Sequence, residues 1–189
     1  MNIMAIWAWL FWGWVGAEAV IAIAMRTRRS SGGQQDRGSQ LLLWVAITIA
    51  ISSSDWIQCV APWPIFGGAA WLLPLSLAIM IVGLTIRAVA IVTLGKAFSV
   101  NVAIRDEQKV QRAGLYRFVR HPSYLGMEIV FLAIGLHSRN WAVLAFILGL
   151  PTLALLYRIH VEEAALNEAF GEEYADYSRV TKRLIPGVF

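Results

Sequence analysis

Five long apolar runs, separated by polar and basic segments, constrain this chain more than any other feature. They cover residues 3–25, 41–60, 70–94, 123–137 and 141–158. A helix needs about 20 apolar residues to cross a hydrocarbon core of about 30 Å, so such runs are typical of membrane-spanning helices. Composition agrees, because 58% of the residues are hydrophobic and only 15% are charged. We therefore expect an all-α, polytopic membrane protein with five transmembrane helices.

The length of 189 residues leaves room for one such domain and for no second folded unit. The first run has no basic leader before it, since the first positive charge is Arg26, and we expect it to remain as a span. Cys59 is the only cysteine, so no intramolecular disulfide forms. The sequence has no paired cysteines and no HExxH motif, and we expect no metal site.

Lysine and arginine gather in three polar segments. Four lie between the first two runs, six lie in the loop 95–122, and four of the 16 lie from residue 158 onward. Cytoplasmic loops carry an excess of these residues, so we expect the three segments in the cytoplasm, the N terminus outside, and the C terminus as an amphipathic cytoplasmic helix. Because the charges lie between apolar runs and form no soluble basic face, we expect no nucleic-acid partner.

Three charged residues fall inside the predicted spans, namely Glu18, Arg87 and Glu128. An unpaired charge at the bilayer centre costs about 3 kcal/mol or more. We therefore expect each side chain to face the bundle interior, water or a partner. An interhelical contact and a functional role both remain open for each.

A dense group of polar and aromatic residues precedes the fourth run, in the segment 114–126, which reads GLYRFVRHPSYLG. Pro122 disfavours helix at His121 and is well placed in the first turn of the following helix. His121 and Ser123 then flank a helix N terminus with unpaired backbone N–H groups. Such a terminus favours a carboxylate or a polar cofactor group.

A second group of charged and aromatic residues follows the fifth run, in the segment 158–177, which reads RIHVEEAALNEAFGEEYADY. Arg158 and Glu162 are four residues apart and therefore lie on one helix face. From spacing alone, a surface ion pair of small energetic value is as good an interpretation as a site.

Together the two segments resemble the isoprenylcysteine carboxyl methyltransferase family and its phospholipid methyltransferase relatives, over roughly residues 80–186. The resemblance implies a pocket for S-adenosylmethionine formed by the segments 95–122 and 158–186, with Arg158 contacting the methyl acceptor and acting with Glu162 in catalysis. The implied cofactor-binding residues are Gln108, Lys109, Val110, Gln111, Tyr116, His121, Pro122, Ser123, Tyr124 and Glu162. Two positions depart from the family pattern, because Gln108 replaces a common histidine and Leu115 a frequent proline.

The chemistry of these residues fits that implication. A carboxylate such as Glu162 complements the sulfonium and ammonium groups of the cofactor, and an arginine such as Arg158 holds a carboxylate with charge-assisted hydrogen bonds. A carboxylate acceptor is already ionised at neutral pH, so its methylation needs alignment and no general base. We expect carboxyl O-methylation of a lipophilic small molecule or lipidated peptide, such as a prenylated cysteine, drawn from the membrane lipid.

Three alternatives stay open. Methylation of a phospholipid amine would need a base, such as Glu163 or Glu128. A membrane reductase of the sterol-reductase type would bind NADPH, with the 2′-phosphate held by the basic loop residues Lys109, Arg112, Arg117 and Arg120. A transporter subunit or structural membrane protein would leave both polar clusters unexplained.

Overall fold

The computed structural model describes residues 2–24, 38–95 and 110–188, and every structural statement below concerns these residues. They form helices, without a strand longer than an isolated bridge in the described ranges. The α-helices are α1 (Ile3–Ala24), α2 (Ser39–Ser52), α3 (Ser54–Val60), α4 (Leu72–Leu94), α5 (Pro122–His137), α6 (Trp141–Phe170) and α7 (Glu172–Val180). Two short 3₁₀ helices, η1 (Ile65–Gly68) and η3 (Gly114–Arg117), complete the set. The predicted all-α class is confirmed.

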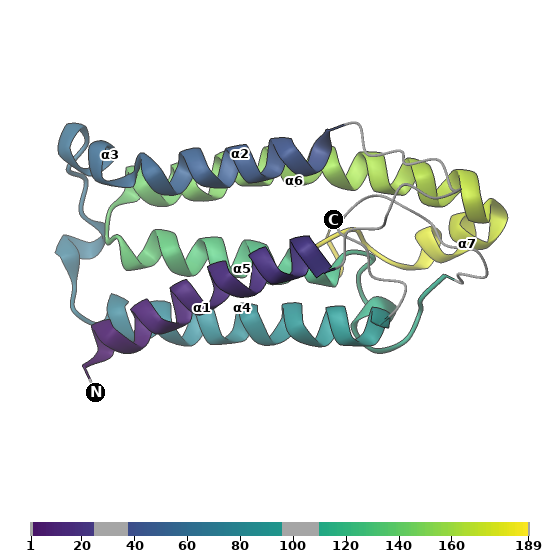
Figure 1. The fold of residues 1–189 in the computed structure, drawn as a ribbon, viewed down its shortest axis with the longest axis horizontal. Helices are drawn as coiled ribbons and strands as arrows, with labels where there is room; N and C mark the ends of the chain where they lie inside the picture. The colour runs from purple at the N-terminus through teal and green to yellow at the C-terminus, as the bar shows by residue number, and fades with distance from the viewer. Residues whose placement is uncertain (1, 25–37, 96–109, 189) are drawn as a thin grey trace.

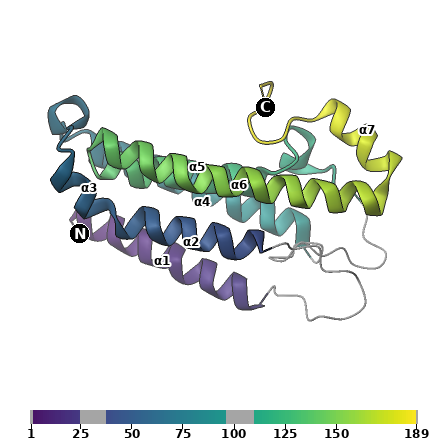
Figure 2. The same cartoon turned by 90° about the horizontal axis from the view of Figure 1, so that it is seen from above.

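The long helices run side by side along one axis. Figure 1 shows α1, α2, α4, α5 and α6 extending along the length of the molecule, and Figure 2 shows the same alignment from above. Helix α7 lies at one end of the bundle, whereas α3 and η1 lie at the other. The two ends therefore carry different parts of the chain, as expected for a protein that crosses a membrane.

Three of these helices, α1, α4 and α6, are long and apolar enough to span a membrane, and α2 with α3 makes a fourth candidate if the bent pair is one span. Helix α5 is apolar but has only 16 residues. Large apolar side chains point outward along the bundle, including Trp9, Ile23 and Val92, each at least 75% exposed. A multi-pass membrane protein accounts for both observations.

The run 41–60, expected as one straight span, is broken. Helices α2 and α3 meet at a bend of 46°. The hydroxyls of Ser52, Ser53 and Ser54 donate hydrogen bonds to the carbonyls of Thr48, Ile49 and Ala50 respectively. Side-chain bonds of this kind compete with the helical ladder and bend helices, which explains the break.

The last long helix continues beyond the boundary predicted at residue 158. Helix α6 extends to Phe170 and ends at Gly171, whose φ of 51° is left-handed. Between Arg158 and Gly171 the helix has no glycine and no break. The apolar run 141–158 and the charged segment that follows it therefore form one helix. At 30 residues it is about 45 Å long, which exceeds a hydrocarbon core of about 30 Å.

Helices α4 and α5 are in direct backbone contact. A Cβ at Gly126 would lie 2.7 Å from the Arg87 backbone nitrogen, and one at Gly83 would lie 2.9 Å from the Gly126 carbonyl oxygen. Only glycine permits this approach, as in other close-packed membrane helices. The contact places the Arg87 side chain beside Ser123 at the start of α5.

Candidate functional site

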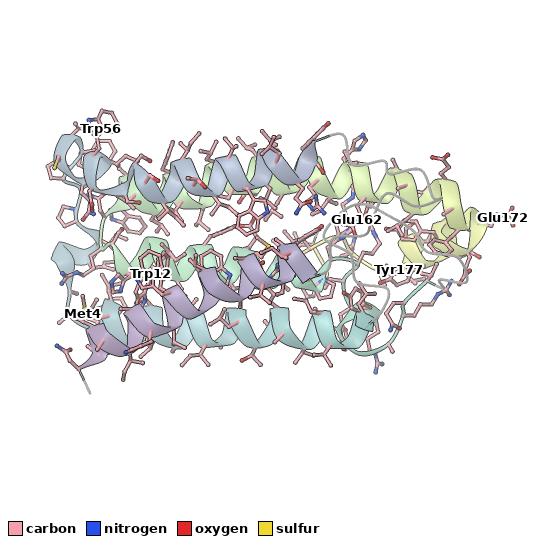
Figure 3. All side chains as sticks on the ribbon, in the orientation of Figure 1. Met4, Trp12, Trp56, Glu162, Glu172 and Tyr177 are labelled. Carbon is pink, nitrogen blue, oxygen red and sulfur yellow. The ribbon has the colours of Figure 1, made fainter. Side chains whose placement is uncertain are left out.

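The two motif segments meet at the end of the bundle where α7 lies. Figure 3 labels Glu162 and Tyr177 toward this end, with Met4 and Trp56 at the other. Tyr124 of α5 donates its hydroxyl proton to Glu162 Oε2 at 2.7 Å. Arg158 Nε donates to the same hydroxyl oxygen at 2.8 Å. Tyr124 therefore joins the arginine and the carboxylate that sequence spacing placed on one face of α6.

His121 lies between two neighbouring carboxylates. Its Nδ1 is 3.9 Å from Glu162 Oε2, and its Nε2 is 3.4 Å from Glu163 Oε1. The ring is buried and stacks on Tyr124, with centroids 5.5 Å apart. Histidine, tyrosine and Glu162 thus form one contiguous polar surface.

Glu163 ties this surface to the C-terminal segment. Its Oε1 accepts from Arg120 Nε at 2.8 Å, and its Oε2 accepts from Arg183 Nε at 2.9 Å. Backbone bonds run parallel to these contacts, because the N–H groups of Arg120 and His121 donate to the carbonyls of Lys182 and Arg183 at 2.7 and 3.0 Å. The C-terminal segment therefore fixes the motif that precedes α5.

Tyr116 forms a second wall of the same region. Its hydroxyl donates to the Ala90 carbonyl of α4 at 3.3 Å, and its own carbonyl accepts from the Tyr177 hydroxyl at 2.6 Å. Burial, followed by the negative charge of Glu162, raises the pKa of the Tyr116 phenol. The phenol therefore stays protonated at neutral pH.

The predicted cofactor segment 108–111 is only half described. Gln108 and Lys109 lie outside the described residues, and Val110 is half-buried. Gln111 donates its side-chain N–H to the Thr93 carbonyl at 2.9 Å and accepts from the Ala113 backbone N–H at 3.1 Å. The Gln111 side chain thus caps the end of α4 and shapes the turn that follows.

Pro122 and Ser123 begin α5, as predicted. Pro122 is fully buried. Ser123 Oγ accepts from Arg87 Nη1 at 2.8 Å, and Arg87 also pairs with Glu18 of α1. Glu18 and Arg87 form an ion pair, and the Ser123 side chain is engaged with α4 through Arg87.

The third charged residue within a predicted span lies one helical turn along α5 from Tyr124. Glu128 Oε2 accepts from the Thr152 hydroxyl at 2.9 Å, and Oε1 is buried with no hydrogen-bond partner among the described residues.

Among the described residues there is no group of three or more His, Cys, Asp or Glu side chains that could hold a metal ion.

Two residues that contact this network carry no motif. Ser39, the first residue of α2, accepts from Arg158 Nη1 at 3.2 Å, and Glu18 reaches the network through Arg87. Both stand in segments that show only hydrophobicity in sequence. The sequence shows only that Ser39 is a polar residue at the edge of an apolar run and that Glu18 is a charged residue within one. Such a position indicates that the side chain has a partner, but it does not identify the partner.

Known proteins resemble this chain in sequence. A sequence model described as the isoprenylcysteine carboxyl methyltransferase (ICMT) family matches residues 76–168, which include Arg87, Tyr124, Arg158 and Glu162. Protein-S-isoprenylcysteine O-methyltransferase B of Arabidopsis thaliana is 28% identical over 182 residues, which cover 91% of this chain and 87% of that protein. The chain is thus similar to the ICMT family over about half of its length. Its relatives are named as methyltransferases, which agrees with the enzyme class that its motifs predicted.

Other relatives differ in length and in the acceptor that they are named for. The protein-S-isoprenylcysteine O-methyltransferase of Rattus norvegicus is 30% identical over 139 residues, or 70% of this chain and 48% of the rat protein. Methanethiol S-methyltransferase 1 of Bradyrhizobium diazoefficiens is 36% identical over 72 residues, or 38% of this chain and 24% of that protein. The chain is thus also similar, over a shorter stretch, to a protein named for a small thiol acceptor.

Proposed function

We propose that the chain transfers a methyl group from S-adenosylmethionine to the carboxylate of a lipophilic acceptor, such as a prenylated cysteine. The observation that carries the proposal is the bridge of Tyr124 between Arg158 and Glu162. Through the Tyr124 phenol, it links Arg158, which is suited to an anionic methyl acceptor, with Glu162, which is suited to the cationic methyl donor. Methyl transfer to a carboxylate requires these two charges to be held close together and in fixed orientation.

The residues present fit the donor. The Glu162 side chain is 31% exposed, although Tyr124 and His121 pack against it, so one face of the carboxylate remains accessible to a cation. When bound, S-adenosylmethionine supplies an electrophilic methyl group on a positively charged sulfur. Glu162 would hold its cationic part, with His121–Tyr124, Tyr116 and Gln108–Gln111 around the remainder.

The acceptor would be held by Arg158. The side chain is buried and already contacts Tyr124 and Ser39, so an acceptor carboxylate would replace the Ser39 hydroxyl at the guanidinium. The exchange replaces a hydrogen bond from the guanidinium to a neutral hydroxyl by one to a carboxylate, in which both partners are charged, and such a bond is stronger. No residue of the chain has to accept a proton, because the acceptor is ionised beforehand.

We further propose that the chain is one domain with five membrane crossings, the N terminus outside and the site at the cytoplasmic face. The distribution of lysine and arginine supports this orientation. Helix α5 is about 24 Å long, shorter than a hydrocarbon core of about 30 Å, and would cross where the bilayer thins or where flanking residues reach the interface. The three-residue turn 138–140 between α5 and α6 supports a crossing and a return.

Methyl transfer from labelled S-adenosylmethionine to defined acceptors tests the function. Purified protein is expected to methylate N-acetyl-S-farnesylcysteine and to leave an ethanolamine phospholipid and methanethiol unmodified. Arg158→Lys keeps the charge but loses the planar donor pair, and we expect kcat/KM for the farnesylcysteine to fall by about tenfold or more. Labelling of the phospholipid alone would establish N-methylation, and labelling of the thiol alone would establish S-methylation.

A binding measurement separates the methyltransferase from the reductase. Thermal unfolding with S-adenosylhomocysteine or with NADPH is expected to show stabilisation by the former only, because only a ligand of the folded state raises the midpoint. The relatives described above are named as methyltransferases. Stabilisation by NADPH alone would contradict the proposal.

A further inference from the structure

Helix α1 buries only two of its described side chains, Trp14 and Glu18. They are one helical turn apart, and Trp14 Nε1 donates to Glu18 Oε1 at 3.2 Å. Most other residues of α1 are half-buried or exposed. The family match begins at residue 76, so α1 lies outside it. A helix with so little buried surface nevertheless places a carboxylate inside the bundle.

That carboxylate is held by a two-point contact with Arg87 of α4. Arg87 Nη2 donates to Glu18 Oε2 at 2.6 Å, and Arg87 Nε donates to Glu18 Oε1. The two side chains are 5% and 9% exposed, so the ion pair is nearly dry. The fork geometry fixes the plane of the guanidinium and directs its remaining nitrogen, Nη1, away from Glu18.

The remaining nitrogen holds the start of α5. Arg87 Nη1 donates to Ser123 Oγ at 2.8 Å and to the Ser123 carbonyl oxygen at 3.3 Å. Gly126, one turn later, packs directly on the Arg87 backbone, so the same part of α4 contacts two successive turns of α5. Ser123 precedes Tyr124, whose hydroxyl bridges Arg158 and Glu162. A continuous chain of contacts therefore runs from α1 to the candidate site.

We infer that Glu18 is a positioning residue of the methyltransferase site. It orients Arg87, Arg87 holds Ser123 and the first turn of α5, and that turn sets the Tyr124 hydroxyl between Arg158 and Glu162. This inference rests on the proposed function, and it makes α1 part of the catalytic unit as well as a membrane anchor. A displacement of about 1 Å at a reacting centre lowers rates by up to about a hundredfold, so the effect is measurable.

Removing both charges together keeps the experiment interpretable. Single substitutions leave a buried unpaired charge and destabilise strongly, whereas an apolar pair of similar volume is tolerated. We expect Glu18→Leu with Arg87→Met to fold, with kcat for methyl transfer reduced at least tenfold and KM for the donor changed less than threefold. Trp7→Phe is the matched control, because Trp7 stacks on His137 at the other end of α5, away from Ser123.

A double-mutant cycle separates positioning from plain stabilisation. If Glu18 and Arg87 act through the Tyr124 hydroxyl, the paired substitution costs little more in a Tyr124→Phe background than that variant alone. The inference would be overturned if the losses in kcat from the paired substitution and from Tyr124→Phe multiply when combined. It would also be overturned if the Glu18→Leu, Arg87→Met variant folds and has wild-type kinetics. If the pair variant does not fold, Arg87→Lys serves instead, because lysine keeps the charge facing Glu18 but lacks the fork that also holds Ser123. Unchanged kcat in Arg87→Lys would then be the contrary result.

The outcome is distinguishable from failure of the proposed function. Wild-type protein that transfers no methyl group to any of the three acceptors contradicts the function itself. Active wild-type protein with unaffected variants contradicts only the role of Glu18.

Discussion

At the scale of single residues, Tyr124 is where the network converges. Its hydroxyl donates a hydrogen bond to Glu162, and the hydroxyl oxygen accepts one from Arg158. The group is therefore used both as a donor and as an acceptor. Sequence spacing placed Arg158 and Glu162 on one helix face and grouped His121 with Tyr124. It did not predict that a tyrosine joins them, because helical periodicity relates residues within one helix and says nothing about α5 against α6.

Replacing Tyr124 by phenylalanine removes the bridge and little else. We expect kcat/KM for the farnesylcysteine acceptor to fall about tenfold to a hundredfold, since Arg158 and Glu162 lose their common partner. Loss of the buried hydroxyl should destabilise the fold by about 1–3 kcal/mol. Tyr157→Phe is the control, because Tyr157 is an exposed tyrosine of the same helix as Arg158. Wild-type kinetics for Tyr124→Phe would show that the bridge is dispensable.

The buried tyrosines near the C terminus predict sensitivity to alkaline pH. Burial raises the pKa of Tyr177 to about 12, and its hydroxyl must be protonated to donate to the Tyr116 carbonyl. The pKa of this phenol is higher in the folded state than the ordinary value of about 10. Its contribution to stability is therefore full below about pH 10 and is lost as pH rises toward 12.

Unfolding free energy measured between pH 8 and 12 should stay level to about pH 10 and then fall toward pH 12. Tyrosinate absorption should appear at higher pH in folded than in denatured protein. In Tyr177→Phe the fall should be shallower. An equal slope in the variant would assign the effect to other groups.

At the scale of elements, the sequence predicted where helices lie better than how they end or meet. Three of the five runs, 3–25, 70–94 and 123–137, became helices close to their predicted bounds, because long apolar runs are a strong signal. The last run begins at residue 141 as predicted but continues as a helix to Phe170. The bend at Ser53 was missed, because the run 41–60 was expected as one span and the sequence does not show that its serine hydroxyls bond to the helix backbone. The α4–α5 contact was also invisible, because isolated glycines do not reveal which helix they face.

Gly126→Ala tests that contact. The added Cβ would lie 2.7 Å from the Arg87 backbone nitrogen and 2.8 Å from the Gly83 carbonyl oxygen, so α4 and α5 must separate. We expect destabilisation of about 1–3 kcal/mol in thermal unfolding, together with reduced methyl transfer, because Arg87 moves relative to Ser123. Gly149→Ala is the matched control, since a Cβ added there would meet nothing within 4 Å and alanine favours helix by about 1 kcal/mol. Equal stability of the two variants would mean that the helices can adjust.

At the scale of the whole molecule, the chain has two unlike ends. One end carries α7, Glu162 and the segments that meet around Tyr124, and the other carries α3 and the turn between α5 and α6. Charge counting predicted which sequence segments share a side of the membrane. The described parts of two of these segments, residues 110–122 and the C-terminal part of α6 with α7, lie at the same end of the bundle, and the side of the membrane on which they lie stays a prediction.

The single cysteine allows the orientation to be measured. Cys59 is exposed and belongs to α3, at the end of the bundle opposite α7. If the N terminus is outside, a membrane-impermeant maleimide added to right-side-out vesicles should label Cys59 at once. Glu172→Cys in a Cys59→Ser background places the thiol at the α7 end, where Glu172 is exposed, and should react only after the vesicles are permeabilised. The reverse pattern would put the candidate site outside and contradict the positive-inside assignment. Labelling of both thiols without permeabilisation would mean that the two ends do not lie on opposite sides of the bilayer.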